Sequence, residues 1–70
     1  MPASTIKRRD VIEMLLKNGA VLVREGGNHT VYRNPRTGRL LAVPRHREIK
    51  TGLARQVMKD SREGLEEDDG

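Results

Sequence analysis

The chain has 70 residues, of which 14 are basic and 10 acidic, with one tyrosine and no cysteine, tryptophan or phenylalanine. A chain of this length forms one small domain that buries only about 60% of its unfolded surface, so we expect no large internal pocket. The lack of cysteine excludes disulfides and thiolate metal sites, and two histidines alone are too few for a typical metal site, so we expect no metal or cofactor. No apolar run reaches the roughly 20 residues of a membrane span, and we expect a cytoplasmic protein.

The positive charge is unevenly distributed. Residues 61–70 hold one arginine and five acidic residues, whereas residues 1–60 hold the other thirteen basic residues and only five acidic ones. Ten of the basic residues are arginines, whose planar guanidinium matches phosphate geometry better than lysine does. A polyanion is the expected partner, and RNA or DNA is favoured over an anionic membrane because no basic amphipathic helix stands out. The plainer alternative is a merely soluble basic surface.

The first predicted element is a helix from Ile6 to Asn18, after a loose lead-in over residues 1–5. Thr5 or Ser4 can cap its start, and Gly19 is a typical stop. Its apolar residues recur with helical spacing and predict a buried stripe of Val11, Ile12, Leu15 and Leu16.

Three strands are predicted next, over residues 20–24, 29–34 and 39–43. The turn around Gly26 and Gly27 separates the first two and predicts a hairpin, and residues 34–38 form a second turn. Pro44 ends the third strand because it has no backbone N–H to donate.

A second helix is predicted from Thr51, as its cap, to about Asp60. Its expected buried stripe consists of Leu53, Ala54, Val57 and Met58. The order of helix, three antiparallel strands and helix predicts an α+β fold that resembles a double-stranded RNA-binding domain. Both helices would cover one face of the sheet and leave the other face available to a ligand.

The charge distribution divides the chain into a folded domain over residues 1–60 and an acidic tail over residues 61–70. We expect the tail to be disordered or to fray from the second helix. It is either a solvated segment without a role or a weak competitor of RNA for the basic surface.

Two motifs carry a family resemblance. The run GGNHTVYRNPRTGRLLAVPRH, preceded by KNG and followed by EIKTGLARQVM, resembles the HicA family of bacterial toxin–antitoxin ribonucleases from about Lys7 to Asp60. The matching residues are Gly27, His29 and Tyr32 in the first motif, Val43, Pro44 and His46 in the second, and Gly52 at the start of the second helix. The chain departs from the family pattern at Asn28, where serine is common, and at Ala20, where a bulky aromatic residue usually follows the glycine.

The resemblance implies an endoribonuclease that cleaves mRNA without metal, uses His29 as its catalytic residue and is inhibited by a HicB-like antitoxin. The chemistry of the side chain is compatible with that role, because an imidazole in water has a pKa of about 6.5 and can take or give a proton near neutral pH. The adjacent Gly26 and Gly27 would let a phosphodiester approach the backbone closely.

An alternative interpretation gives His29 a packing role. Strand alternation places His29 on one face with Val31 and Arg33, and Thr30 and Tyr32 on the other. If Val31 faces the helices, His29 lies at the edge of the core. The family resemblance favours the catalytic interpretation.

His46 is a possible second acid or base, or a solvated side chain in the basic loop before the second helix. The residues expected to bind RNA are Arg24, Gly27, Asn28, Arg33, Arg45, Arg47 and Lys50. Arg45, Arg47 and Lys50 form the densest basic stretch outside Lys7, Arg8 and Arg9. The rival to a ribonuclease is a non-catalytic RNA-binding module of the same fold, and DNA binding has less support because no recognition-helix motif is present.

Overall fold

A computed structural model describes residues 4–65 of the chain, which form five strands and two helices. In chain order these are β1 (Thr5–Lys7), α1 (Arg8–Lys17), β2 (Val21–Glu25), β3 (His29–Arg33), β4 (Leu40–Pro44), β5 (Glu48–Lys50) and α2 (Thr51–Arg62). Strands β2, β3 and β4 form an antiparallel sheet in that order, and β1 pairs with β5 in a separate two-stranded ribbon. The predicted α+β fold is confirmed.

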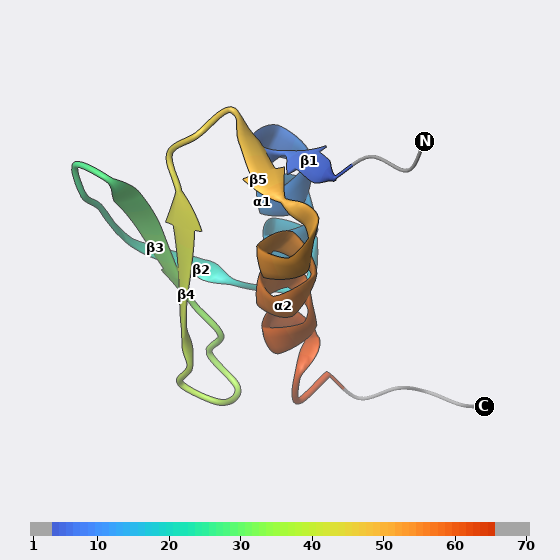
Figure 1. The fold of residues 1–70 in the computed structure, drawn as a ribbon. Coiled ribbons are helices and arrows are strands. Elements are labelled where there is room, and N and C mark those ends of the chain that lie inside the picture. The colour runs from blue at the N-terminus through green and yellow to red at the C-terminus, as the bar shows by residue number, and fades with distance from the viewer. Residues whose placement is uncertain (1–3, 66–70) are drawn as a thin grey trace.

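Both helices lie on one side of the three-stranded sheet, and nothing in the described part of the chain covers its other face (Figure 1). The ribbon of β1 and β5 lies beside the start of α1 and was not predicted. Residue 5 therefore belongs to a strand, where the Thr5 hydroxyl donates to Glu48 Oε1 at 2.6 Å. The expected caps were wrong, because α1 starts after Lys7 without a side-chain cap, and Thr51 is the first residue of α2.

The core lies between the helices and the sheet. Within residues 4–65 it consists of nine buried apolar residues, which are Val11, Leu15, Ala20, Tyr32, Leu41, Val43, Ile49, Ala54 and Val57. Two residues of the expected helical stripes were assigned wrongly, since Leu16 is 53% and Leu53 43% exposed. In α1 the i, i+4 pair of Val11 and Leu15 is fully buried, whereas the adjacent Ile12 and Leu16 are not. The small sheet covers only one such row of the helix.

The helix-facing side of β3 carries Thr30 and Tyr32, which are 1% and 6% exposed. Val31, between them, points to the opposite face. The alternative in which Val31 faces the helices and draws His29 toward the core is therefore wrong. Tyr32, the single aromatic residue, lies opposite Leu41 on β4 and belongs to the core.

A buried asparagine joins the turn between β3 and β4 to the end of α2. Asn34 is fully buried, and its Nδ2 donates to the carbonyl oxygens of Asp60 at 2.8 Å and Glu63 at 3.0 Å. Its Oδ1 accepts from the backbone N–H of Arg36 at 2.9 Å. The Arg36 guanidinium donates to the carbonyls of Ser61 at 2.6 Å and Glu63 at 3.0 Å. The turn thus satisfies carbonyls at the helix end that have no intrahelical partner.

Helix α2 runs two residues past the expected end at Asp60. Ser61 is fully buried, and it accepts a hydrogen bond from Asn18 Nδ2 at 2.9 Å while its own hydroxyl donates to the Met58 carbonyl. The start of the expected acidic tail therefore belongs to the packed structure, and residues 66–70 lie outside the described residues. Neither described helix has the length and apolar character needed to cross a membrane.

We predict that Asn34→Ala lowers the free energy of unfolding by about 2 to 4 kcal/mol, because the substitution removes several buried hydrogen bonds worth about 1 kcal/mol each. Urea denaturation followed by circular dichroism measures the change. Arg39→Ala, at an exposed residue of the same turn, is the matched control and should cost little. Equal stability of the two variants would show that the turn does not hold the end of α2.

Candidate functional site

His29 is exposed at the first residue of β3, on the face of the sheet that the helices leave open. It lies opposite Pro44 on β4. Its carbonyl accepts a hydrogen bond from the Gly26 N–H at 2.8 Å, which closes the turn over residues 26–28. The backbone of His29 is therefore held by the pairing with β4 and by the hydrogen bond from Gly26. Its imidazole is accessible to a large ligand.

The two glycines of this turn have different surroundings. A Cβ added at Gly26 would come within 3.2 Å of the His29 carbonyl oxygen, whereas one added at Gly27 would have no neighbour within 4 Å. Gly26 is thus the residue that the tight turn requires. Gly27 leaves open space above the backbone, as expected for a position that a ligand could approach.

Arg24 is the arginine of β2 that shares the open face with His29. It lies opposite Val31, two residues along β3 from His29, and directly opposed residues project to the same face. Diagonal neighbours of this kind have Cα atoms about 7 Å apart, within reach of a long side chain. Arg33 also faces this side, but it is four residues from His29, or about 13 Å along the strand.

Apolar side chains occupy the rest of the open face. Val21 and Leu40 flank Arg33 on the neighbouring strands and are 46% and 61% exposed. Ala42 and Val31 continue the row toward His29. The middle of the face therefore holds Arg24 beside the apolar Val31 and Ala42, with His29 at one end and Arg33 at the other.

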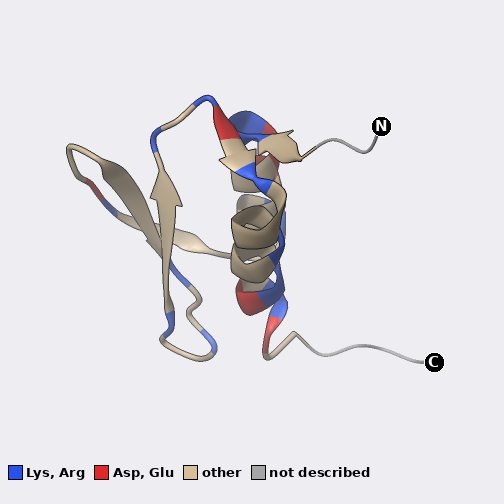
Figure 2. Ribbon diagram, in the orientation of Figure 1, with Lys and Arg blue, Asp and Glu red and all other residues tan. Residues whose placement is uncertain are grey.

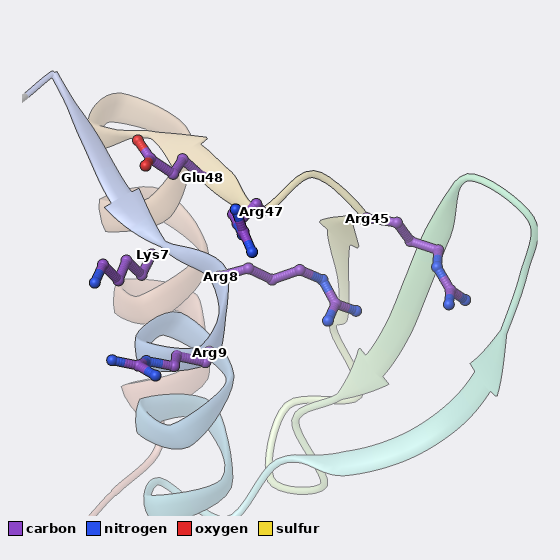
Figure 3. Close-up of a pocket in the computed structure, with 6 residues that line it drawn as sticks. All are labelled: Lys7, Arg8, Arg9, Arg45, Arg47 and Glu48. Carbon is purple, nitrogen blue, oxygen red and sulfur yellow. The ribbon is translucent and has the colours of Figure 1, made fainter.

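A second group of basic residues lies on the opposite side of β3. It lines a pocket of about 590 Å³, and the lining residues are Lys7, Arg8, Arg9, Arg45, Arg47 and Glu48. These residues come from the junction of β1 with α1 and from the loop between β4 and β5 with the first residue of β5. The two segments lie together at one end of the molecule (Figure 2). In Figure 3, Arg8 and Arg47 point into the space between α1 and the hairpin of β2 and β3, and Arg45 lies over the hairpin. Lys7 and Arg9 point away from the hairpin.

Arg8 is a site residue that the sequence did not single out. Its Nη2 donates to the Thr30 hydroxyl at 2.7 Å, and its Nε donates to the Pro44 carbonyl at 3.0 Å. Its backbone N–H donates to the Arg47 carbonyl at 2.8 Å. The run of three basic residues at positions 7–9 was visible in the sequence, but nothing there indicated which of them would point inward.

Arg45 joins this pocket to the turn before His29. Its Nη1 donates to the Gly26 carbonyl at 3.1 Å and lies 3.8 Å from Glu25 Oε1. Its backbone N–H donates to the Asn28 carbonyl at 3.2 Å. The turn over residues 26–28 is therefore held by Arg45, from the loop between β4 and β5, as well as by the hydrogen bond of the Gly26 N–H.

His46 lies in a different place from His29. It lines a mostly apolar pocket of about 410 Å³ with Pro44, Lys50 and Leu53 among others, and His29 is not part of that lining. The expected site residues consequently fall into three groups. His29, Arg24 and Arg33 lie on the open face together with Gly27 and Asn28 of the adjoining turn, Arg45 and Arg47 line the pocket with Arg8, and His46 lies with Lys50. No cluster of three or more histidine, acidic or cysteine residues within residues 4–65 could hold a metal ion.

Comparison with known families gave one finding. A family model described as the HicA toxin of bacterial toxin–antitoxin systems matches residues 8–62. No curated protein and no solved structure gave a significant match. The matched residues run from the first residue of α1 to the last residue of α2 and include both histidines.

We predict that Gly26→Ala displaces the turn and shifts the NMR signals of His29, because its Cβ meets the His29 carbonyl oxygen at a distance that requires one of the two to move. Gly27→Ala, the matched control, should leave the His29 signals nearly unchanged, since its Cβ enters open space. Two-dimensional ¹H–¹⁵N and ¹H–¹³C spectra measure both. Equal shifts in the two variants would contradict the distinction between the glycines.

Proposed function

The chain belongs to the HicA family of bacterial toxin–antitoxin toxins, and we propose that it is a cytoplasmic endoribonuclease that cleaves mRNA with His29 as its catalytic residue. We further propose that the reaction needs no metal and that a HicB-like antitoxin inhibits the toxin. The observation that carries this proposal is the position of His29, exposed at the start of β3 and sharing its face with Arg24.

The proposed reaction is transfer of the phosphodiester to the neighbouring 2′ oxygen. The unprotonated ring nitrogen of His29 accepts the proton of the 2′-OH as that oxygen attacks phosphorus. The bond from phosphorus to the 5′ oxygen breaks, and the 5′ oxygen takes up a proton. The products are a 2′,3′-cyclic phosphate and a 5′-OH end. An exposed imidazole fits this role because the scissile phosphate must reach it together with the adjacent ribose.

Arg24 is the residue that we propose stabilises the charge on the reacting phosphate. Its place diagonal to His29 lets its guanidinium approach the same phosphate, and fixed positive charge near the phosphorane lowers the barrier. Arg33, at the far end of the open face, would contact a different part of the RNA. This ranking of the arginines comes from the strand register and could not be made from the sequence.

Two roles stay open for His46, a second acid or base that protonates the 5′ oxygen and a solvated side chain. Its position in a separate pocket argues against direct contact with a phosphate that lies against His29. The loop that carries it is nevertheless adjacent to the turn of residues 26–28 through the hydrogen bond between Arg45 and Asn28. A comparison of His46→Ala with His29→Ala separates these possibilities, because two proton-transfer residues should cause comparable losses.

The antitoxin would have an apolar surface available on the same face as His29. On that face Val21 and Leu40, which flank Arg33, and Ala42, the next residue of β4 on the same face toward His29, form an exposed apolar row. A protein partner that buried this row would gain from the hydrophobic effect and would also cover the imidazole. Occlusion of His29 is therefore the mode of inhibition that we propose.

The alternative function is a non-catalytic RNA-binding module. One observation favours it, namely that the pocket lined by five basic residues does not include His29. Both functions require phosphate binding, and only the ribonuclease requires the imidazole.

We predict that His29→Ala abolishes RNA cleavage and growth arrest while RNA affinity changes little, because the phosphate-binding arginines are retained. A positioned acid or base contributes about 10²- to 10⁴-fold in rate. Cleavage of a labelled RNA in the presence of EDTA, with analysis of the ends formed, provides the measurement. We expect 2′,3′-cyclic phosphate ends.

A melting curve of each variant is the control for this experiment, since a small domain can lose activity by unfolding. Full nuclease activity in a folded His29→Ala protein would falsify the catalytic assignment. A wild-type protein that binds RNA but never cleaves it, even when free of antitoxin, would favour the binding module.

We also predict that RNA binding weakens steeply with salt, because binding neutralises several phosphates and releases their counterions. For single-stranded RNA, log K should fall with log salt by about 0.7 for each phosphate contact. Fluorescence anisotropy with a labelled, non-cleavable 2′-O-methyl RNA measures the slope. A flat response would rule out phosphate binding as the main source of affinity.

A further inference from the structure

We infer that the pocket lined by residues 7–9 and 45–48, referred to below as the basic pocket, binds a backbone phosphate of the RNA other than the one that is cleaved. This inference rests on the proposed function in taking RNA as the substrate. It adds a second phosphate subsite that would anchor the strand at a distance from His29.

The charge of the basic pocket is the first observation. Five of its six lining residues are basic and one, Glu48, is acidic. One carboxylate oxygen of Glu48 accepts a hydrogen bond from the Thr5 hydroxyl at 2.6 Å, and Glu48 is in neither of the ion pairs found around this pocket. Arg9 and Arg45 each lie within 4 Å of a carboxylate, Asp10 at 3.9 Å and Glu25 at 3.8 Å. The excess positive charge of the lining therefore comes from Lys7, Arg8 and Arg47, and it favours an anionic ligand.

The environment of Arg8 is the second observation. Its guanidinium is half-buried, and its two hydrogen-bond acceptors, the Thr30 hydroxyl and the Pro44 carbonyl, are both neutral. No carboxylate within residues 4–65 lies at ion-pair distance from it. Partial burial of a charge without an opposite charge is costly, and a phosphate in the pocket would supply that opposite charge.

The rigidity of the pocket also suits phosphate binding. Two hydrogen bonds fix the Arg8 side chain, and the bond from its backbone N–H to the Arg47 carbonyl holds the two segments of the pocket together. Arg45 is tied to the Gly26 carbonyl. Side chains already held in place lose less conformational entropy when a ligand binds.

The phosphate in this pocket cannot be the one that reacts at His29. Arg8 contacts Thr30 on the helix-facing side of β3, whereas His29, the preceding residue, projects to the open side. The strand itself separates the two groups. An RNA strand that uses both must pass around the end of the hairpin at residues 26–28 and place different phosphates in the two sites.

The test compares a dinucleotide, which has only the scissile phosphate, with a single-stranded RNA of about a dozen nucleotides that carries one cleavable linkage. Arg47→Gln removes a charge from the pocket, and the Arg47 side chain makes no hydrogen bond within residues 4–65, so the fold should be kept. We expect its KM for the longer RNA to rise by about tenfold, the usual effect of one lost charge-assisted hydrogen bond. The change for the dinucleotide should be several times smaller.

Arg55→Gln is the matched control, since Arg55 is an exposed arginine of α2 outside the basic pocket. It makes the same change of net charge and should leave both substrates nearly unaffected. Equal losses on the two substrates with Arg47→Gln would mean that the pocket holds the scissile phosphate, which would overturn the inference. Equal losses with Arg47→Gln and Arg55→Gln would overturn it as well.

A binding measurement distinguishes failure of this inference from failure of the proposed function. If the wild-type protein cleaves neither substrate, the affinity of a non-cleavable 2′-O-methyl RNA of the longer length still tests the pocket. Weaker binding by Arg47→Gln than by Arg55→Gln supports the phosphate subsite, and equal binding overturns it. Displacement of this RNA by an oligoglutamate peptide as effectively as by unlabelled RNA would overturn it in favour of an acidic protein segment.

Discussion

The burial of Tyr32 determines which face of β3 every neighbouring side chain occupies. Side chains alternate along a strand, so burying Tyr32 and Thr30 against the helices sends Val31 and His29 to the open face. The register with β4 then aligns His29 with Pro44 and fixes the position of the loop that follows. Because Tyr32, the single aromatic residue of the chain, is buried in the core, His29 is exposed on the opposite face of β3. A shift of β3 by one residue would bury His29 and remove Tyr32 from the core together.

Polar contacts at the two ends of the sheet complement a core that, in the described part of the chain, has nine buried apolar residues. At one end, Asn34 and Arg36 bind the final carbonyls of α2. At the other end, Arg8 joins α1 to β3 and β4. These contacts are directional, so they specify how the helices sit on the sheet where apolar packing alone would tolerate several arrangements. The two ends differ in charge balance. The Asn34 side chain is neutral and is hydrogen-bonded to backbone groups of the helix end and the turn. The charge of Arg8 has no counter-charge within the described residues.

The sequence predicted the elements that carry a strong local pattern and missed those that depend on contacts between distant residues. The helical spacing of Val11 and Leu15 and the Gly19 stop, at φ 91°, were sufficient for α1. Strands β1 and β5 have three residues each and only one apolar pair, Ile6 with Ile49, so neither shows an alternating pattern until the other is beside it. The exposure of His29 could not be predicted, because alternation gives two faces without saying which one the helices cover. Arg8 was likewise indistinguishable from its basic neighbours, since its inward position depends on acceptors in β3 and β4.

The open face and the basic pocket share one backbone element, the turn over residues 26–28. His29 follows this turn directly and accepts a hydrogen bond from Gly26, while the Gly26 carbonyl accepts from Arg45 of the pocket. A displacement of the turn would therefore move the imidazole and one wall of the pocket at the same time. Side-chain substitutions at His29 or Arg47 leave that backbone in place and can separate the proposed catalysis from the proposed phosphate binding. A substitution that reshapes the turn cannot separate them, because it changes the geometry of both surfaces.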